Sequence, residues 1–548
     1  MAHASYSYPS HLVPLIDLAL VLAAALLMAA APRWSARLAA AAWRVPRRLG
    51  RRPGRALAIL AVLGTVANGA VFLLQGAPVP AATDELSYLL AADTFAAGRL
   101  TNPYHPKWRH FHPHPLWWPV CASKYPPAQG LYLALGQVLT GSPAVAVCLG
   151  APLLAAAVGW ALFGWLRPKW AVLGGFLVLV RLGVGSYWNQ SYWGGTVAAV
   201  GGALLFGALP RFLDRPRPGM GLVMAAGVVV LANSRPYEGL LVSLPTLAVL
   251  AVRGLREART RRALLPGALV LALAGGAMAF YNKRVTGDPL LLPHRAYANA
   301  YNHEPELVFV PYSPPKHAYQ KLPPRSSAAS RPAGERPSWL ARSLRQGIHR
   351  LGRMLYFVLG CALAFAPLFA RYRGRPRHVL LAVSCALVAA GDMVTRAWFP
   401  HYSAPLTVPL LVLALLGLRL LAAWRRGGRR PWRAAPWAVA AIFLTLFAVE
   451  LPAHRSDADA WNVVRQRLEE ELRALPGKHL VIVDPPGDWP SSAADVDAAP
   501  VVWARPVDEA SDRRLLEYYR DRSIWWLDLT RNGMPVLVPY SGVGGEVP

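Results

Sequence analysis

The stretch ALAILAVLGTVANGAVFLLQGAPVPAATDELSY, residues 56–88, predicts how this chain meets a membrane. The apolar run 56–76 is long enough to cross a bilayer as a helix, and the acidic pair Asp84-Glu85 follows after one short loop. Ionisable side chains are costly to keep close to a membrane, so a functional site is the first hypothesis for this pair.

The composition indicates a polytopic membrane protein. Of the 548 residues, 54% are hydrophobic and only 16% are charged, and the mean hydropathy is +0.29. The net charge of +29 would also suit a nucleic-acid-binding protein. The arginines, however, lie in short clusters between apolar runs, which is the pattern of the positive-inside rule.

Six basic clusters set the expected topology, and we place all of them in the cytoplasm. They are Arg33–Arg55, Arg167–Lys169, Arg211–Arg217, Arg253–Arg262, Arg371–Arg377 and Arg425–Arg433. The fold class expected is therefore an α-helical polytopic membrane protein of about twelve transmembrane helices, with both termini outside. The expected spans are 11–31, 56–76, 142–165, 170–187, 194–211, 219–233, 238–252, 264–281, 351–370, 379–397, 404–423 and 434–451. No basic region precedes the first apolar run, so we interpret it as a retained helix and not as a signal peptide.

The chain divides into a membrane domain, 1–451, and a polar tail, 452–548. The membrane domain has two long outer loops, 77–141 and 282–350. The tail carries 16 acidic and 11 basic residues, a net charge of −5 that opposes the +29 of the whole chain. Its pattern predicts helices at 457–474 and 508–520 and strands at 479–483, 501–504 and 524–529, which is the order of a small extramembrane α/β domain.

The first outer loop is expected to hold two helices on the membrane surface. Residues 84–97 have helical character, with Leu86, Leu89, Leu90 and Phe95 facing the lipid. A second interfacial helix is expected at 128–140, because Pro126-Pro127 suits a first helical turn. The loop would thus present an acidic site and a basic site, Lys124, at one membrane face.

An acidic pair after an early membrane helix, followed by Lys124-Tyr125-Pro126-Pro127, resembles the GT-C class of polytopic glycosyltransferases. This class includes protein O-mannosyltransferases and the lipid A aminoarabinose transferase. The resemblance covers about 77–420 and is strongest over 84–135. The tracts 186–195, 233–239 and 401–405 look like a bacterial branch of the class whose substrates are unknown. Two helices before the acidic loop, and the tail, depart from the usual pattern.

The resemblance implies transfer of a sugar from a polyprenyl-phosphate donor to an acceptor hydroxyl at the outer membrane face. Asp84 would then be the catalytic base, with Glu85 as its partner or alternative, and Lys124 would contact the donor phosphate. The chemistry asks for the same residue types, because one carboxylate must activate the acceptor and cations must stabilise the departing phosphate. Further candidates for binding the substrate or its phosphate are Tyr125, Arg235, Arg295 and His401. A single base predicts inversion.

Each assignment has a structural rival. Asp84-Glu85 could cap a helix, Lys124 could reach to lipid headgroups, and Arg235 could pair with Glu238. Asp392 is better explained by an i,i+4 pair with Arg396. Trp188 and Trp193 fit an interface belt, with sugar stacking as a minor use.

No cofactor is certain from the sequence. His105, His110, His112 and His114 gather in the first loop, but they lack specific zinc spacing, so no metal site is assigned to them. A divalent ion at Asp84 stays open, since some GT-C members use one.

Two other functions also stay open. A lipid-linked oligosaccharide polymerase or ligase would rely on arginines in large outer loops. A lipid-linked sugar transporter or flippase should have inverted repeats, and none is evident. The high Ala and Arg content indicates a bacterial source. The expected location is the inner membrane, with the site and the tail facing the periplasm or the exterior, and the expected partners are the donor lipid, an unknown lipid, glycan or protein acceptor, and the bilayer.

Overall fold

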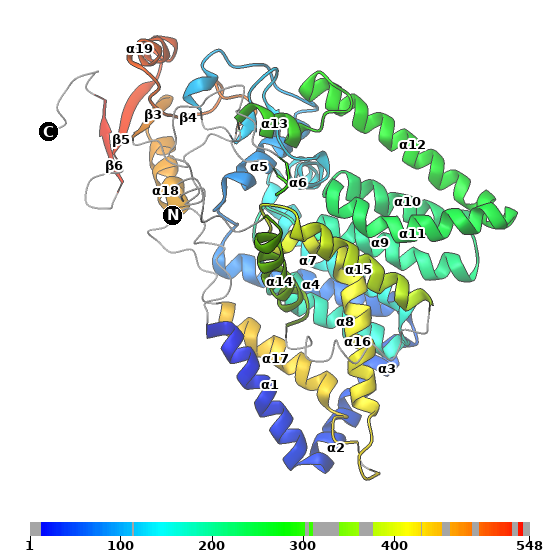
Figure 1. Cartoon of the computed structure of the whole chain (residues 1–548). Coiled ribbons are helices and arrows are strands. Elements are labelled where there is room, and N and C mark those ends of the chain that lie inside the picture. The colour runs from blue at the N-terminus through cyan, green and yellow to red at the C-terminus, as the bar shows by residue number, and fades with distance from the viewer. Residues whose placement is uncertain are drawn as a thin grey trace.

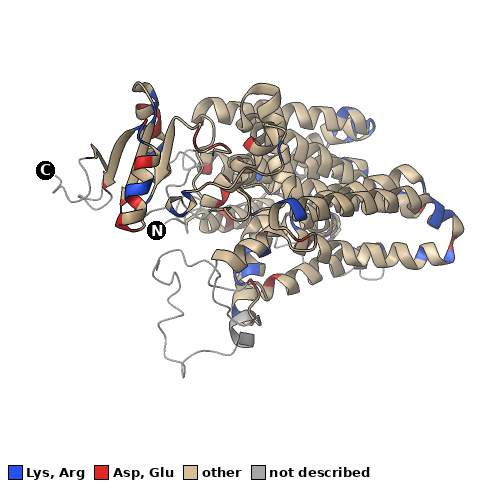
Figure 2. Cartoon of the chain, turned by 90° about the horizontal axis from the view of Figure 1, so that it is seen from above, with Lys and Arg blue, Asp and Glu red and all other residues tan. Residues whose placement is uncertain are grey.

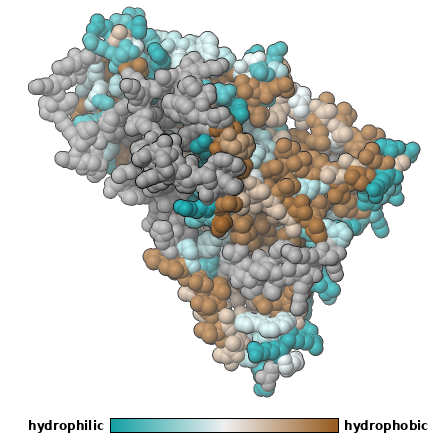
Figure 3. All heavy atoms as spheres, in the orientation of Figure 1, coloured by the Kyte–Doolittle hydropathy of each residue, from teal (hydrophilic) through white to brown (hydrophobic). Residues whose placement is uncertain are grey.

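The computed structural model is a bundle of helices with a small sheet at one end (Figure 1). It describes residues 12–111, 114–301, 306–310, 339–360, 376–428, 430–451, 461–484, 493–528 and 535–540. Eight helical segments within this part of the chain are long and apolar enough to cross a membrane. Hydrophobic residues cover a broad area of the helices, and hydrophilic residues gather at the far tips (Figure 3).

The eight apolar segments are distributed along most of the chain. They are α1 (Leu12–Ala30), α4 (Pro53–Gln75), α7 (Pro143–Trp165), α9 (Thr196–Asp214), α11 (Pro236–Arg256), α12 (Ala258–Thr286), α15 (Pro376–Met393) and a 3-10 turn, η6 (Pro400–Leu406), continued by α16 (Thr407–Ala423). Two shorter apolar helices are α10 (Pro218–Ala232) and α17 (Ala435–Glu450). The remaining helices of the bundle are α2 (Pro32–Ala42), α3 (Arg44–Gly50), α8 (Pro168–Val178), which a π-helical turn, η2 (Leu179–Val184), extends, and α14 (Trp339–Leu359).

A helix covers at least the first part of each of the twelve spans expected from the sequence, although α14 begins at Trp339, well before the span expected at 351–370. The number of crossings stays a prediction, because only eight segments of the described chain meet the length and hydropathy of a span. The span expected at 379–397 was too long, since α15 ends at Met393. The second half of 351–370 lies outside the described residues.

Proline sets the start of many of these helices. Pro53, Pro143, Pro168, Pro218 and Pro236 each occupy the first turn of a helix, where the missing N–H costs nothing and the fixed φ angle suits the helix. The helices then pack closely at glycine. A Cβ added at Gly202 of α9 would stand 2.3 Å from the Pro405 carbonyl oxygen, so α9 can lie against η6 only without a side chain there.

In the first long loop, the helix at 83–96 is buried in the protein instead of lying on the membrane. The helix at 127–140 keeps an exposed apolar face with Leu131 and Leu135, so its place on the membrane surface stays a prediction. Helices α5 (Thr83–Ala96) and α6 (Pro127–Thr140) form where the sequence placed them, and a short antiparallel pair, β1 (Pro115–Leu116) and β2 (Ala122–Ser123), lies between them. Leu86 and Leu90 are 1% and 2% exposed. Their expected contact with lipid is therefore wrong, because α6 and residues of the tail cover that face of α5.

The tail forms a four-stranded sheet in the order β4-β3-β5-β6. β3 (His479–Asp484) pairs in parallel with β4 (Val501–Ala504) and β5 (Ser523–Asp528), and β6 (Val536–Pro539) runs antiparallel to β5. Helices α18 (Trp461–Ala474) and α19 (Glu509–Tyr518) accompany the sheet. These elements agree with the sequence patterns except for β6, which was not foreseen. The acidic residues gather on this side of the molecule (Figure 2).

The tail is attached to the first loop by a buried apolar cluster and by polar contacts. Leu90, Phe111 and Trp117 of the loop share a core with Leu480 and Tyr519 of the tail. The Asp497 carboxylate accepts hydrogen bonds from the Tyr519 hydroxyl at 2.7 Å and the Tyr518 hydroxyl at 2.8 Å, and it contacts His105 Nε2 at 3.1 Å. Asp93 of α5 accepts a bond from the Ala494 backbone N–H at 2.8 Å. The tail is thus bonded directly to α5, the helix that carries Asp84.

Replacing Asp497 by Asn should loosen this attachment. The carboxylate is partly exposed, so we expect a loss of about 1–2 kcal/mol of unfolding free energy and faster hydrogen exchange in 493–528. Asp495→Asn is the matched control, because that side chain caps only the local Ala498 N–H. Equal exchange rates in the two variants would contradict the role given to Asp497.

Candidate active site

Asp84 and Lys124 form an ion pair at one end of the helical bundle. Asp84 lies in the first turn of α5, and Lys124 directly follows β2. The Lys124 Nζ atom is 3.0 Å from Asp84 Oδ1, and the two side chains are 12% and 27% exposed. Separate roles were expected for these two residues, and the structure brings them into direct contact.

Glu85 occupies a different position from its neighbour. It is fully buried, and its carboxylate accepts three backbone hydrogen bonds, from Ala81 and Ala82 at 2.9 and 3.1 Å and from Tyr192 at 2.8 Å. The first two satisfy N–H groups at the start of α5, as in a capping box. The third ties α5 to the segment between η3, a single 3-10 turn (Tyr187–Asn189), and α9. Glu85 therefore fixes where the first turn of α5, and with it Asp84, is held.

Tyrosine rings surround the Asp84–Lys124 pair. Tyr88 lies one helical turn after Asp84, and its ring stacks on that of Tyr125 with centroids 4.4 Å apart. The Lys124 ammonium lies 5.2 Å from the centroid of Tyr125 and 4.4 Å from that of Tyr297. Tyr297 belongs to α13 (Pro293–Tyr301), which comes from the second long loop. The pair is thus enclosed by both outer loops.

The pair shifts the titration of both of its members. Burial raises the pKa of Asp84, but the Lys124 charge, a hydrogen bond from Tyr125 and the nearby His294 together outweigh burial, so the pKa lies below the ordinary value. Burial lowers the pKa of Lys124, but the charge and hydrogen bond of Asp84, with the nearby Tyr297 and Tyr402, together outweigh burial and raise that pKa. Both groups are therefore charged at neutral pH. Burial, followed by the Asp84 charge, raises the pKa of Tyr125, which stays a neutral hydrogen-bond donor.

Arg235 approaches the same tyrosines from the turn before α11. Its guanidinium lies 4.3 Å from the centroid of Tyr402, which lies in η6. Burial alone would lower the pKa of Arg235. The nearby Tyr88, Tyr402 and Glu238 together outweigh burial and raise that pKa, so the side chain stays charged. Arg235 and Lys124 thus place two cations on one tyrosine-lined site.

Helix α13 contributes a second charged group at the edge of the site. His294 Nδ1 contacts Glu306 Oε1 at 2.5 Å, and Arg295 lies 3.9 Å from Glu306. Arg295 is half exposed, whereas the His294 ring lies 5.9 Å from the ring of Tyr125. Of these two residues, His294 is the one that contacts the tyrosines around Asp84.

His401, Trp188 and Trp193 form packing beside the site. His401 is fully buried, its Nδ1 lies 2.8 Å from the Tyr187 hydroxyl, and its ring contacts Trp193 and Phe399. Trp188 and Trp193 are 2% and 5% exposed, so their faces are covered by protein. These residues shape the floor of the site, and neither tryptophan offers a free face to a sugar or a place in an interface belt.

The expected ion pair between Asp392 and Arg396 does not form. α15 ends at Met393, so the two side chains do not share a helical face. The Asp392 Oδ2 atom instead accepts hydrogen bonds from Trp398 Nε1 at 2.9 Å and the Ser403 hydroxyl at 3.3 Å. Arg350 donates to the Asp392 carbonyl at 2.7 Å, which ties α14 to the end of α15.

The side chains around Asp84 do not fit a divalent ion, because the Lys124 ammonium is already paired with the Asp84 carboxylate. The described residues also include no group of three His, Cys, Asp or Glu side chains that could hold a metal ion. In the first loop, His105 and His110 contact the tail at Asp497 and at the Arg505 carbonyl. His112 lies outside the described residues.

Sequence reasoning missed Tyr88, Tyr297, Tyr402 and His294. Tyr88 could have been found, because it follows Asp84 by four residues on a predicted helix. Tyr402 lay in a tract already singled out for His401. Tyr297 and His294 carried no local signal, since only the fold of the second loop brings them to Lys124.

No family model and no curated protein sequence matches the chain. Solved structures do. ArnT from Cupriavidus metallidurans bound to undecaprenyl phosphate matches with a TM-score of 0.55 at 13% identity, over 89% of this chain and 99% of that one. Its apo state matches with a TM-score of 0.51 at 12% identity, over 86% and 92%. An apo oligosaccharyltransferase from Archaeoglobus fulgidus matches with a TM-score of 0.50 at 11% identity, over 87% and 69%. The chain therefore has the fold of the GT-C class of polytopic glycosyltransferases, as its motifs predicted.

Proposed function

We propose that this protein transfers a sugar from a polyprenyl-phosphate donor to an acceptor hydroxyl, with Asp84 as the base. The observation that carries the proposal is the contact of 3.0 Å between Asp84 and Lys124 in a site lined by tyrosines. Such a site offers a carboxylate for the acceptor and a cation for the phosphate within a few ångströms of each other, which is the pair of groups that this transfer needs.

The donor phosphate would bind to Lys124 and Arg235. Both side chains are charged and partly shielded from water. A phosphate would bind them strongly, because charge-assisted hydrogen bonds strengthen when water is excluded. The similar ArnT structure is bound to undecaprenyl phosphate, which supports a polyprenyl lipid as the carrier. Arg295, at the exposed edge, would have only a secondary contact with the donor.

The reaction would proceed by direct displacement. The acceptor oxygen attacks the anomeric carbon while the bond from that carbon to the phosphate oxygen breaks, and the bonding electrons leave with the phosphate. The acceptor proton passes to Asp84. One base on the face opposite the leaving group gives inversion at the anomeric carbon.

The ion pair would also couple donor binding to base strength. When the phosphate takes the Lys124 ammonium, Asp84 loses its nearest positive charge while it stays shielded from water. Its pKa should then rise, which makes it a better base once the donor is in place. Glu85 would act as a positioning residue, because its carboxylate is already engaged by backbone donors.

We further propose that the site and the tail face the outside of a bacterial inner membrane. The six basic clusters of the sequence support this orientation. The division into a membrane domain, 1–451, and an extramembrane tail, 452–548, belongs to the same proposal.

The direct test is consumption of a panel of polyprenyl-phosphate sugars by the purified protein with candidate acceptors. Asp84→Asn should lower turnover of the accepted donor by about 10²–10⁴-fold, because the base is lost. The same change leaves the shielded Lys124 charge without its partner, so the melting temperature should also fall, and turnover is compared at a temperature where both proteins are folded. Asp288→Asn is the control, since that carboxylate bonds only its own exposed turn. Full turnover by Asp84→Asn would overturn the assignment and favour a polymerase or ligase.

Glu85→Gln should mainly lower the free energy of unfolding and should have a smaller effect on turnover. The change removes the charge that accepts three buried backbone N–H groups, so we expect a loss of about 2–3 kcal/mol of unfolding free energy. Turnover should fall by less than in Asp84→Asn. A stable Glu85→Gln protein without turnover would make Glu85 the base instead.

The pH profile should report the ion pair. Asp84 has a lowered pKa, so the acid limb of kcat/KM should lie below the ordinary range of a carboxylate. Lys124→Met removes the lowering charge and leaves burial in place, and the limb should move to higher pH by more than about one unit. Lys124→Arg should keep the limb low. An unchanged limb in Lys124→Met would contradict the coupling.

A further inference from the structure

A cluster of cations lies at the end of the bundle opposite to Asp84. Trp43, between α2 and α3, is its centre and is 5% exposed. The Trp43 ring lies 4.9 Å from Trp170 and 5.3 Å from Trp437, and the Lys169 ammonium lies 4.7 Å from its centroid. Helix α3 packs beside the beginning of α8 (Figure 1), where a Cβ at Gly50 would come within 2.9 Å of Pro168.

Four arginines lie near Lys169, one of them local in the sequence and three on neighbouring elements. Arg167 precedes Lys169 by two residues at the start of α8, and Arg47 lies on α3, which packs against α8. Arg419 lies near the end of α16, which contacts both α8 and α17, and Arg433 lies in the turn before α17. We call these five side chains the Trp43 basic cluster: Arg47, Arg167, Lys169, Arg419 and Arg433.

Among the residues that the structure describes, no carboxylate neutralises the Trp43 basic cluster. The sequence has no Asp or Glu between Asp17 and Asp84, between Asp93 and Asp214, or between Asp392 and Glu450, and these are the segments that carry the five cations. In the described part of the chain, none of the five forms an ion pair. Like charges held this close repel each other, so the cluster is incomplete without an anion.

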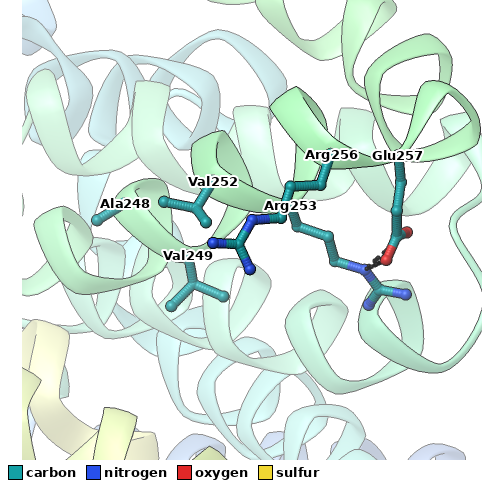
Figure 4. A pocket seen from close by; sticks show the side chains of 6 residues that line it. All are labelled: Ala248, Val249, Val252, Arg253, Arg256 and Glu257. Carbon is teal, nitrogen blue, oxygen red and sulfur yellow. Dashed lines mark hydrogen bonds and ion pairs between the residues drawn. The ribbon is translucent and has the colours of Figure 1, made fainter.

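Other basic groups at the same end of the bundle do have acidic partners. Arg253 is paired with Glu257 at 2.9 Å and donates to the Leu213 carbonyl, beside a pocket lined by Ala248, Val249, Val252 and Arg256 (Figure 4). Arg377 is paired with Asp214 at 2.5 Å. The positive-inside rule explains an excess of arginine at this end, but it does not explain why one group lacks partners and surrounds tryptophans.

We propose that the Trp43 basic cluster binds the phosphate headgroup of an anionic phospholipid from the adjoining leaflet. The cations lie where apolar helices α8, α16 and α17 begin or end, which is the depth of lipid phosphates. Trp437 is only partly buried and suits the same depth, because amphipathic rings prefer the headgroup region. Trp43 and Trp170 are 5% exposed and form the packed support on which Lys169 lies. Basic pockets between membrane helices on the cytoplasmic side are a known setting for anionic headgroups. This site is separate from the proposed sugar transfer.

The test is lipid binding to the purified full-length protein in neutral detergent. Phosphatidylglycerol and phosphatidylcholine are titrated, bound lipid is counted by native mass spectrometry, and the shift in the melting temperature is measured, since a ligand of the folded state stabilises it. The triple variant Arg47→Gln/Arg167→Gln/Arg433→Gln should bind phosphatidylglycerol more weakly by at least about tenfold. Phosphatidylcholine binding should not change.

The matched control is Arg259→Gln/Arg261→Gln/Arg262→Gln, which removes the same charge from exposed arginines of α12 at the same end. It should bind phosphatidylglycerol like the unmodified protein. An equal loss of phosphatidylglycerol binding in both triple variants would mean that diffuse charge attracts the lipid. No loss of binding in either variant would mean that the Trp43 basic cluster binds no phosphatidylglycerol. Either result would overturn the proposal, and so would binding of free pyrophosphate as tight as that of phosphatidylglycerol, which would indicate a soluble ligand.

Discussion

The Asp84–Lys124 ion pair is the constraint on which the arrangement of the site depends. Two charges that are largely removed from water are tolerated only as partners, so whatever positions one of them must position the other. Glu85 fixes the first turn of α5, and the β1–β2 pair delivers Lys124 to it. The tyrosines then exclude water and strengthen the attraction.

The tail and the second long loop both contribute contacts that hold this pair in place. Asp93 connects the C-terminal part of α5 to Ala494, and His105 connects the loop after α5 to Asp497, so the tail holds the end of the helix that carries the carboxylate. Tyr297 of α13 lies over Lys124. The tail also packs against Leu90 of α5 and shields it from water or lipid.

The sequence predicted the helices well because hydropathy and basic clusters are local signals. It also predicted α5, α6 and most tail elements, and it singled out Asp84 and Lys124 from motif resemblance. It failed where distant segments meet. Leu86 and Leu90 were assigned to lipid because the cover that the tail provides cannot be read locally. Trp188 and Trp193 have the composition of an interface belt, and only their packing against Gly195 and Phe399 reveals burial.

The most direct test of the account is an experimental structure of the protein with a polyprenyl phosphate bound. The account predicts that the phosphate lies at hydrogen-bond distance, about 3 Å, from Lys124 Nζ, with Arg235 as its second cation and with the Asp84 contact to Lys124 broken or shared. A phosphate bound elsewhere, with the Asp84–Lys124 pair intact, would contradict it.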